Sequence, residues 1–177
     1  MEYVAFSTAQ ESVPEHLPKD ILSKEVRQAT SALGIKEENL VILDYKVRKL
    51  NFSRQDILED LIKIRQKKKY DLVLIPSLGD VHQDHATIAQ EAVRAFKSTT
   101  ILSYELIWNN LSYDSTCFIH LDETHIQRKY QALQFYRSQE GRPYISKDFI
   151  YSLAKVRGVQ IGTNYAECFE VVRWVVS

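Results

Sequence analysis

Two histidines and two aspartates lie close together in one short segment of this 177-residue chain. The segment, residues 76–85, reads Pro-Ser-Leu-Gly-Asp-Val-His-Gln-Asp-His and holds Asp80, His82, Asp84 and His85. His82 and His85 are three residues apart, so they share a face if they lie in the first turn of a helix. Imidazoles with carboxylates beside them suit a divalent metal such as zinc. The alternative is an ordinary surface turn in which Asp84 caps the helix, because His-x-x-His is a short pattern.

The flanking sequence places this segment on a strand-to-helix turn. An apolar run at residues 71–75 predicts a buried strand, and a helical pattern runs from residue 86 to about 96. In open α/β sheets, ligands bind at such turns, at the carboxyl ends of the strands. The turn is therefore the first candidate for a functional site.

Strands and helices alternate along the rest of the chain. We expect strands at 3–6, 40–43, 71–75, 100–104, 117–121 and 165–175, and helices at 20–33, 53–69, 86–96, 122–136 and 146–158. Expected helix signals are N-caps at Ser53, Asp122 and Ser146 and a C′ glycine at Gly34. This alternation implies a Rossmann-like three-layer α/β sandwich with a mostly parallel sheet. Since there is no internal repeat or linker, we expect residues 1–177 to form one domain.

The amino-acid composition indicates which classes of partner and which cellular compartment to expect. The chain has 23 basic and 23 acidic residues and no net charge, so we expect no nucleic acid as a partner. The basic run Lys67–Lys69 is interpreted as a helix end, where cations complement the helix dipole. Cys117 and Cys168 are too few for a disulfide framework and favour a reducing cytoplasm. No apolar run reaches membrane-spanning length, and no signal peptide is evident.

Residues 76–85 resemble the second motif of the GlcNAc-phosphatidylinositol de-N-acetylase family, known as PIG-L, with its bacterial LmbE-like members. Residues 104–109, Tyr-Glu-Leu-Ile-Trp-Asn, are similar to a Tyr-Glu-Leu-Pro-Trp-Asn segment of the bacterial members. Further similar stretches are 25–34, 54–58, 136–139 and 165–170. The resemblance therefore spans essentially the whole chain.

The resemblance implies a zinc hydrolase that removes an N-acetyl group from an amino sugar or glycan precursor. By position, His85 would be a zinc ligand, and His82 would stabilise the oxyanion or act as a general acid. Asp84 would orient His82. Zinc would polarise the amide carbonyl and lower the pKa of its bound water.

Four further residues are candidates for binding the substrate, a small amino sugar or sugar conjugate. Trp108 can stack on a sugar and Asn110 can hydrogen-bond to it; the alternative is a packed aromatic and a turn-forming amide. Asp80 can contact the substrate or support a neighbour, although aspartate is also common in turns. Arg48 can bind an anionic group of the substrate, unless it is simply a surface arginine in a connector.

One departure from the family concerns its N-terminal strand, which ends in His-Pro-Asp-Asp and supplies two zinc ligands and the general base. This sequence contains no such motif. Relative to the family we therefore expect the first strand and helix to be missing. A catalytic zinc normally has three protein ligands, so we expect this chain to be inactive unless the motif is supplied. Loss of a central strand would also leave two unpaired edges, which favour a homo-oligomer.

Three explanations remain open. The chain is a fragment of an active de-N-acetylase, or the missing piece is a separate chain, or this is a shortened paralogue without catalysis. The first two predict a zinc-dependent amide hydrolase. The third predicts a protein that keeps the fold and acts in binding or interaction.

Overall fold

The computed structural model describes residues 1–176, and in it the chain divides into two compact units. The first unit holds residues 1–47 and 119–167, and the second holds residues 48–118 and the residues from 168 onward. The boundaries fall inside two strands, β5 (Cys117–Leu121) and β6 (Tyr165–Arg173). The expectation of a single domain stays a prediction.

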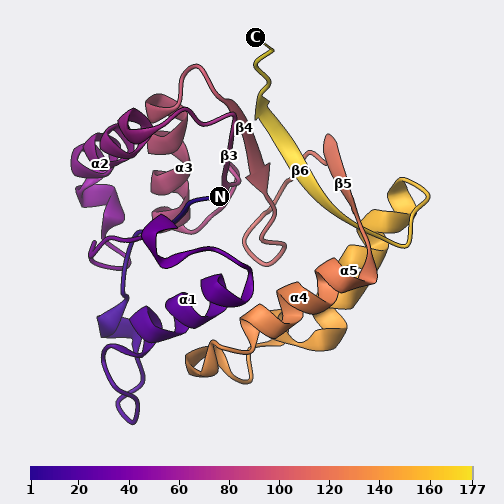
Figure 1. Cartoon of the computed structure of the whole chain (residues 1–177), viewed down its shortest axis with the longest axis horizontal. Helices are drawn as coiled ribbons and strands as arrows, with labels where there is room; N and C mark the ends of the chain where they lie inside the picture. The colour runs from indigo at the N-terminus through magenta and orange to yellow at the C-terminus, as the bar shows by residue number, and fades with distance from the viewer. Residues whose placement is uncertain (177) are drawn as a thin grey trace. The chain divides into compact units, whose positions relative to one another are not determined.

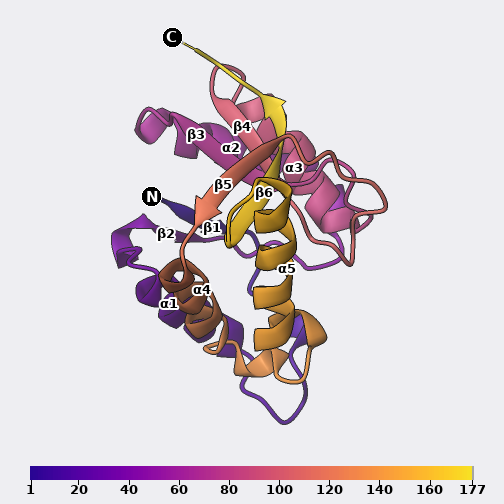
Figure 2. The same ribbon diagram turned by 90° about the vertical axis from the view of Figure 1, so that its right-hand side faces the viewer.

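The first unit combines a short parallel strand pair with three helices. β1 (Tyr3–Ala5) pairs with β2 (Leu40–Ile42). The helices are α1 (Ile21–Ala32), α4 (Glu123–Leu133) and α5 (Lys147–Gln160). Figure 2 shows α1 and α4 lying side by side. The core between α4 and α5 is formed by Ile126, Ile150 and Ala154, with Leu121, Tyr130, Leu133, Phe149, Tyr151 and Tyr165 packed around them.

The second unit is built on a sheet in the order β3-β4-β6-β5. β3 (Leu72–Pro76) is parallel to β4 (Thr100–Tyr104), and β4 is antiparallel to β6. α2 (Arg54–Lys67) and α3 (Gln83–Ala95) lie side by side, and α3 is the one next to β3, as Figure 1 shows. Buried apolar side chains of this unit include Ile57, Leu61, Ile64, Ile75, Ala92 and Ile101.

A buried carboxylate ties α2 to α3. Glu91 is fully buried, and its two oxygens lie 2.6 Å from Arg54 Nη2 and 2.5 Å from Arg94 Nη1. A buried charge is costly unless it is paired, so the two arginines offset the cost of placing this carboxylate between the helices. The cluster fixes α3, the helix that begins at the histidine turn.

The expected α/β class with parallel strand pairs is confirmed, and the strands predicted at 100–104 and 117–121 are found with those bounds. The remaining elements agree to within a few residues, and β6 is antiparallel to its neighbour β4. Among residues 1–176, β1 pairs only with β2 and β3 only with β4. Each of these two strands therefore has one edge without a strand neighbour in the described sheets.

Most of the predicted helix signals are present. Asp122 caps α4 in a reciprocal capping box with His125, and the Ser146 side chain caps α5. Gly34 follows α1 with φ +80°, the left-handed conformation that glycine adopts without strain. Ser53 occupies the N-cap position of α2, as predicted, but its side chain makes no capping hydrogen bond. Its φ of −113° and ψ of 25° lie outside the extended region that a capping side chain requires.

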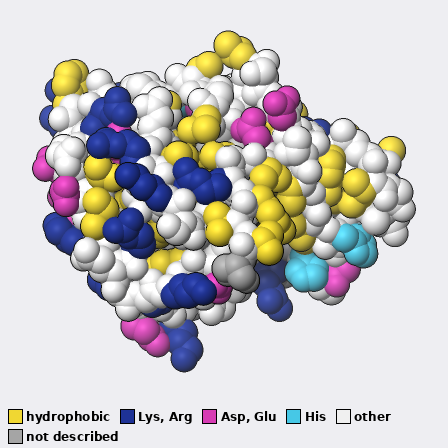
Figure 3. All heavy atoms as spheres, turned by 90° about the horizontal axis from the view of Figure 1, so that it is seen from above, with side chains coloured by type: hydrophobic (Ala, Val, Ile, Leu, Met, Phe, Trp, Pro, Cys, Tyr) yellow, Lys and Arg dark blue, Asp and Glu magenta, His cyan; other side chains and the backbone are white. Residues whose placement is uncertain are grey.

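The basic run Lys67–Lys69 begins at the last residue of α2, as predicted. Figure 3 shows Lys and Arg side chains gathered on the left of the face seen from above, the side on which Figure 1 draws α2. Hydrophobic and acidic side chains are interspersed among them. In the part of the chain that the structure describes, no helix has the length and apolar character needed to cross a membrane.

Candidate active site

The histidine segment forms the turn between β3 and α3 in the second unit. The Asp80 N–H donates to the Ser77 carbonyl oxygen at 3.2 Å, and the Gly79 N–H donates to Ser77 Oγ at 3.1 Å. The turn is also joined to the loop after β4, because the Val81 N–H donates to the Asn109 carbonyl oxygen at 3.1 Å. The site is thus built from one strand end, one helix start and one loop of the same unit.

Asp80 is the centre of the hydrogen bonds in this turn. It is 5% exposed, and its Oδ1 accepts from the His82 backbone N–H at 2.7 Å. Its Oδ2 lies 2.8 Å from His85 Nδ1. Both carboxylate oxygens are therefore used within the turn, and one of them fixes the orientation of a histidine ring.

His82 is the N-cap residue of α3, and its ring performs the capping. His82 Nδ1 accepts from the Asp84 backbone N–H at 3.2 Å. A nitrogen that accepts a hydrogen bond carries no proton, so the neutral ring has its proton on Nε2. The free edge of His82 is consequently a hydrogen-bond donor. The alternative in which Asp84 caps the helix is wrong, because the cap is His82.

His85 has the opposite arrangement of its ring nitrogens. Its Nδ1 faces the buried Asp80 carboxylate, so this nitrogen carries the proton and donates it. Asn109 Nδ2 also lies 3.4 Å from the same nitrogen. The lone pair is then on Nε2, and a carboxylate bound to the opposite nitrogen is the arrangement found behind metal-binding histidines. The two rings are stacked with centroids 4.4 Å apart, so a ring with a donor nitrogen packs against a ring with an acceptor nitrogen.

The Asp84 carboxylate does not take the position expected for orienting His82. It is 4% exposed, and its oxygens accept from the backbone N–H groups of Arg48 at 2.5 Å and Leu50 at 3.2 Å. The bond between Asp84 and His82 uses the backbone of Asp84 instead. Arg48 has φ +64°, a conformation that costs a residue with a side chain about 1–2 kcal/mol. Asp84 therefore holds a strained connector against the start of α3.

The loop after β4 carries two of the predicted substrate residues. Asn110 Oδ1 accepts from the Leu106 N–H at 2.7 Å, and Asn110 forms an isolated β-bridge with Asp80. Its Nδ2 is buried without a hydrogen-bond partner among the described residues. Trp108 is 48% exposed beside it. The side chain of Arg48 is also exposed.

The same loop is fixed to the sheet by a tyrosine. The Tyr113 hydroxyl donates to the backbone oxygens of Ser103 at 2.7 Å and Cys168 at 3.2 Å. Burial, with the nearby Cys168 as the next cause, raises the pKa of the Tyr113 phenol well above its usual range. The phenol therefore stays protonated and keeps donating at all physiological pH values.

Sequence reasoning missed three groups at this site. Asn109 reaches the ring of His85, and its position directly before a candidate residue was the available signal. Ser77 and Glu170 interact across the sheet, 93 residues apart in sequence, and no local pattern indicates such a pair. Glu167, in the same terminal strand, pairs with Lys129 at 2.5 Å and so has a structural partner.

Among residues 1–176, no three His, Cys, Asp or Glu side chains are arranged to hold a metal ion together. His85 fits as one ligand through Nε2, whereas the carboxylates of Asp80 and Asp84 are used by other groups. The described residues thus fit part of a zinc site and do not complete one.

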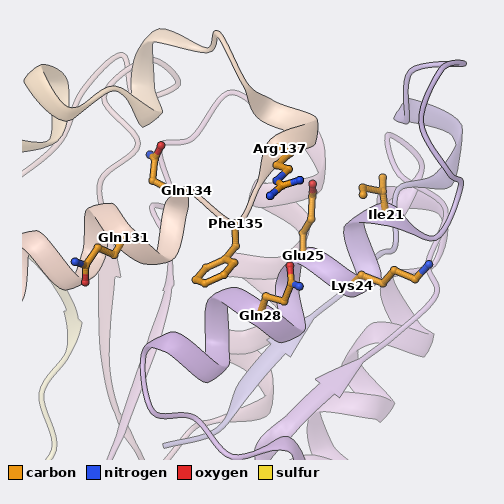
Figure 4. A pocket seen from close by; sticks show the side chains of 8 residues that line it. All are labelled: Ile21, Lys24, Glu25, Gln28, Gln131, Gln134, Phe135 and Arg137. Atoms are coloured by element: carbon orange, nitrogen blue, oxygen red, sulfur yellow. The ribbon is translucent and has the colours of Figure 1, made fainter.

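A cavity of about 390 Å³ lies in the first unit between α1 and the end of α4. Figure 4 shows its lining residues, Ile21, Lys24, Glu25, Gln28, Gln131, Gln134, Phe135 and Arg137. None of the predicted site residues lines it. The candidate site therefore rests on the chemistry of the turn and not on the presence of this cavity.

The chain belongs to the PIG-L family, whose model, described as GlcNAc-PI de-N-acetylase, matches residues 5–96. This match covers slightly more than half of the 177 residues and includes the whole histidine turn. No match was found among curated proteins.

Solved structures share the fold at low sequence identity. The N,N'-diacetylchitobiose deacetylase of Pyrococcus horikoshii has a TM-score of 0.78 and 21% identity, over 96% of this chain and 72% of that chain. A zinc-inhibited form of teicoplanin deacetylase Orf2 has a TM-score of 0.69 and 15% identity, over 95% and 81% of the two chains. GalB of Pseudomonas putida, a 4-carboxy-2-hydroxymuconate hydratase, has a TM-score of 0.73 and 19% identity, over 100% and 85%. The fold thus carries more than one reaction, and the site must decide the function.

Proposed function

We propose that this chain is a metal-dependent de-N-acetylase that hydrolyses the acetamide of an amino sugar or glycan precursor. The observation that supports it best is the pair of opposed histidines in the turn. His82 presents an N–H at its free edge, while His85 presents a lone pair, because each Nδ1 is committed to a different partner. Hydrolysis of an amide needs both kinds of group side by side: a donor to the developing oxyanion and a ligand for a Lewis acid.

In this proposal His82 acts on the acetamide carbonyl. Water adds to the carbonyl carbon, negative charge develops on the oxygen, and the C–N bond then breaks to release acetate and the amine. The His82 Nε2–H donates to that oxygen as the charge develops. Neither aspartate of the turn is free to take the proton from water, since their oxygens accept backbone and imidazole hydrogens. We therefore assign no general base among these residues.

We propose zinc as the metal and His85 as its ligand from this turn. When bound, zinc would supply a Lewis acid at the acetamide carbonyl. Asp80 holds the His85 ring in the orientation that leaves Nε2 available, so we assign Asp80 to positioning this histidine and not to the substrate. We assign Asp84 to positioning as well, through its backbone N–H to His82 and its carboxylate to the connector.

The substrate is proposed to lie along the loop after β4. The half-exposed Trp108 offers an aromatic face, and the buried Asn110 Nδ2 offers an unused hydrogen-bond donor. Arg48, exposed and held beside the start of α3, offers a cation for an anionic group on the sugar conjugate. A cytoplasmic location stays a prediction, supported by two free cysteines, of which Cys168 is buried.

The direct test is acetate release from N-acetylglucosamine and N,N'-diacetylchitobiose, with zinc added and with His82→Ala and His85→Ala as controls. We expect release that both substitutions abolish or strongly reduce. The alternative function, a family member that binds without turnover, predicts that the same sugars shift NMR signals of the turn while no acetate appears. That outcome would replace the enzymatic proposal with the binding one.

A further inference from the structure

A cluster of three polar side chains joins two neighbouring strands of the second unit, β4 and β6, to the histidine turn. Glu170 on β6 lies opposite Ser103 on β4, and its Oε2 accepts from Ser103 Oγ at 2.9 Å and from Ser77 Oγ at 3.4 Å. Ser77 and Ser103 are 1% and 0% exposed. Glu170 itself is partly exposed, and the two buried serine hydroxyls supply hydrogen bonds to its carboxylate on the protein side. The Glu170 carboxylate is therefore the acceptor that orients the hydroxyls of Ser77 and Ser103.

Ser77 is the member of this cluster that belongs to the active-site turn. A serine hydroxyl has one proton, and in Ser77 this proton is directed to Glu170. Its lone pairs are then directed to the Gly79 N–H, 3.1 Å away, and the Ser77 carbonyl accepts from the Asp80 N–H. Gly79 also lies close to the loop after β4, because a Cβ there would be 3.3 Å from the Ser112 backbone oxygen. Glu170 thus sets the direction of the hydroxyl that closes the turn.

We infer that Glu170 is a positioning residue of the candidate active site, acting through Ser77 on the Asp80–His85 pair. The path runs from the Glu170 carboxylate to the Ser77 hydroxyl, through the turn to the buried Asp80 carboxylate, and from there to His85 Nδ1. Hydrogen bonds in such a chain strengthen one another. This inference rests on the proposed function only in treating His85 as a working residue of the site.

The experiment measures solvent exchange of the His85 Nδ1–H proton by NMR in protein labelled with ¹⁵N-histidine, assigned by its loss in His85→Gln. In the wild type we expect a protected ring proton, because its acceptor is buried. Glu170→Ala and Ser77→Ala should each speed its exchange by about five- to tenfold, the effect of losing one hydrogen bond of ordinary strength. Because both act through one path, the double variant should exchange no faster than the faster single variant.

Two matched variants separate positioning from packing. Glu170→Gln keeps an acceptor oxygen for the Ser77 hydroxyl, so it should restore exchange to within about twofold of the wild type. Ser103→Ala removes the other donor to the same carboxylate oxygen but has no link to the turn, so it should change exchange by less than about twofold. Amide exchange at Ile101 on β4 reports the integrity of the sheet and should stay unchanged in all of these variants.

Several results would overturn the inference: no protected His85 proton in the wild type, unchanged exchange in Glu170→Ala, or equal acceleration at Ile101 and His85. If Glu170→Ala does not fold, Ser77→Ala decides, because it breaks the same path while leaving the carboxylate in place. The assay reports hydrogen bonding and not turnover. Absence of acetate release together with the predicted exchange pattern would therefore refute the proposed function and leave this inference standing.

Discussion

Replacing Asp84 by asparagine tests whether this residue of the histidine motif works through its backbone and the connector. The Asp84 carboxylate is 4% exposed and accepts from two backbone N–H groups, those of Arg48 and Leu50. Asparagine keeps one acceptor oxygen and turns an NH2 group toward the other donor. The loss is one hydrogen bond to a charged group, about 1.5–3 kcal/mol. We expect the free energy of unfolding to fall by about 2–3 kcal/mol on that basis.

Urea unfolding followed by circular dichroism measures this change, as a lower midpoint at an unchanged slope. Asp71→Asn is the matched control, because Asp71 is an exposed aspartate in the same unit and its loss should cost less than about 0.5 kcal/mol. Arg48→Gly should act in the opposite direction and stabilise by about 1 kcal/mol, since glycine adopts φ +64° without strain. If Asp84→Asn lowered the free energy of unfolding as little as Asp71→Asn, the inference that the Asp84 carboxylate holds the connector would be wrong.

Three further predictions follow from packing and pairing. Gly158→Ala should lower the thermal unfolding midpoint and cost about 2–3 kcal/mol, because its Cβ would lie 2.7 Å from backbone atoms of Asn164; an unchanged midpoint would contradict this. Glu91→Ala should lower the free energy of unfolding in urea by about 2 kcal/mol. This is less than the loss for a fully buried ion pair, because both arginine partners are half-exposed and water can solvate them. An unchanged free energy would mean that the cluster contributes nothing to stability. The wild-type chain should form dimers or larger species in light scattering, since β3 pairs on one side only and leaves Leu74 48% exposed. Leu74→Lys should raise the monomer fraction, whereas a wild type that is wholly monomeric would refute the edge-pairing argument.

Much of the fold could be predicted from the sequence because the signals are local. The apolar runs of β3 and β4 are bounded by polar segments, and the caps Asp122 and Ser146 mark two helix starts. Such signals depend on residues within one turn or one strand, so they survive without knowledge of the tertiary structure. Ser53 is the N-cap of α2 as predicted, but its backbone, which also ends the preceding short helix, lies outside the extended region in which a side chain caps.

The sequence singles out the histidine turn as a candidate site, but it does not give the hydrogen-bond partners of each residue there. The spacing of His82 and His85 places both at the start of α3, yet the protonated nitrogen of each ring depends on its partner. Asp84 reaches Arg48, 36 residues earlier in the chain, and its carboxylate was therefore assigned to the wrong neighbour. Contacts of this kind arise from tertiary packing, and no spacing rule encodes them.

The central claim is that His82 presents a hydrogen-bond donor at its free edge and His85 presents a lone pair. Zinc titration of the full chain, followed by NMR of the histidine rings, tests it most directly. We expect weak binding, because the described residues supply one fitting ligand. Zinc should shift the Nε2 signal of His85, His85→Ala should abolish the binding, and His82→Ala should leave it nearly unchanged. If His82→Ala loses zinc as completely as His85→Ala, both histidines are ligands and the assignment of a donor and an acceptor is wrong.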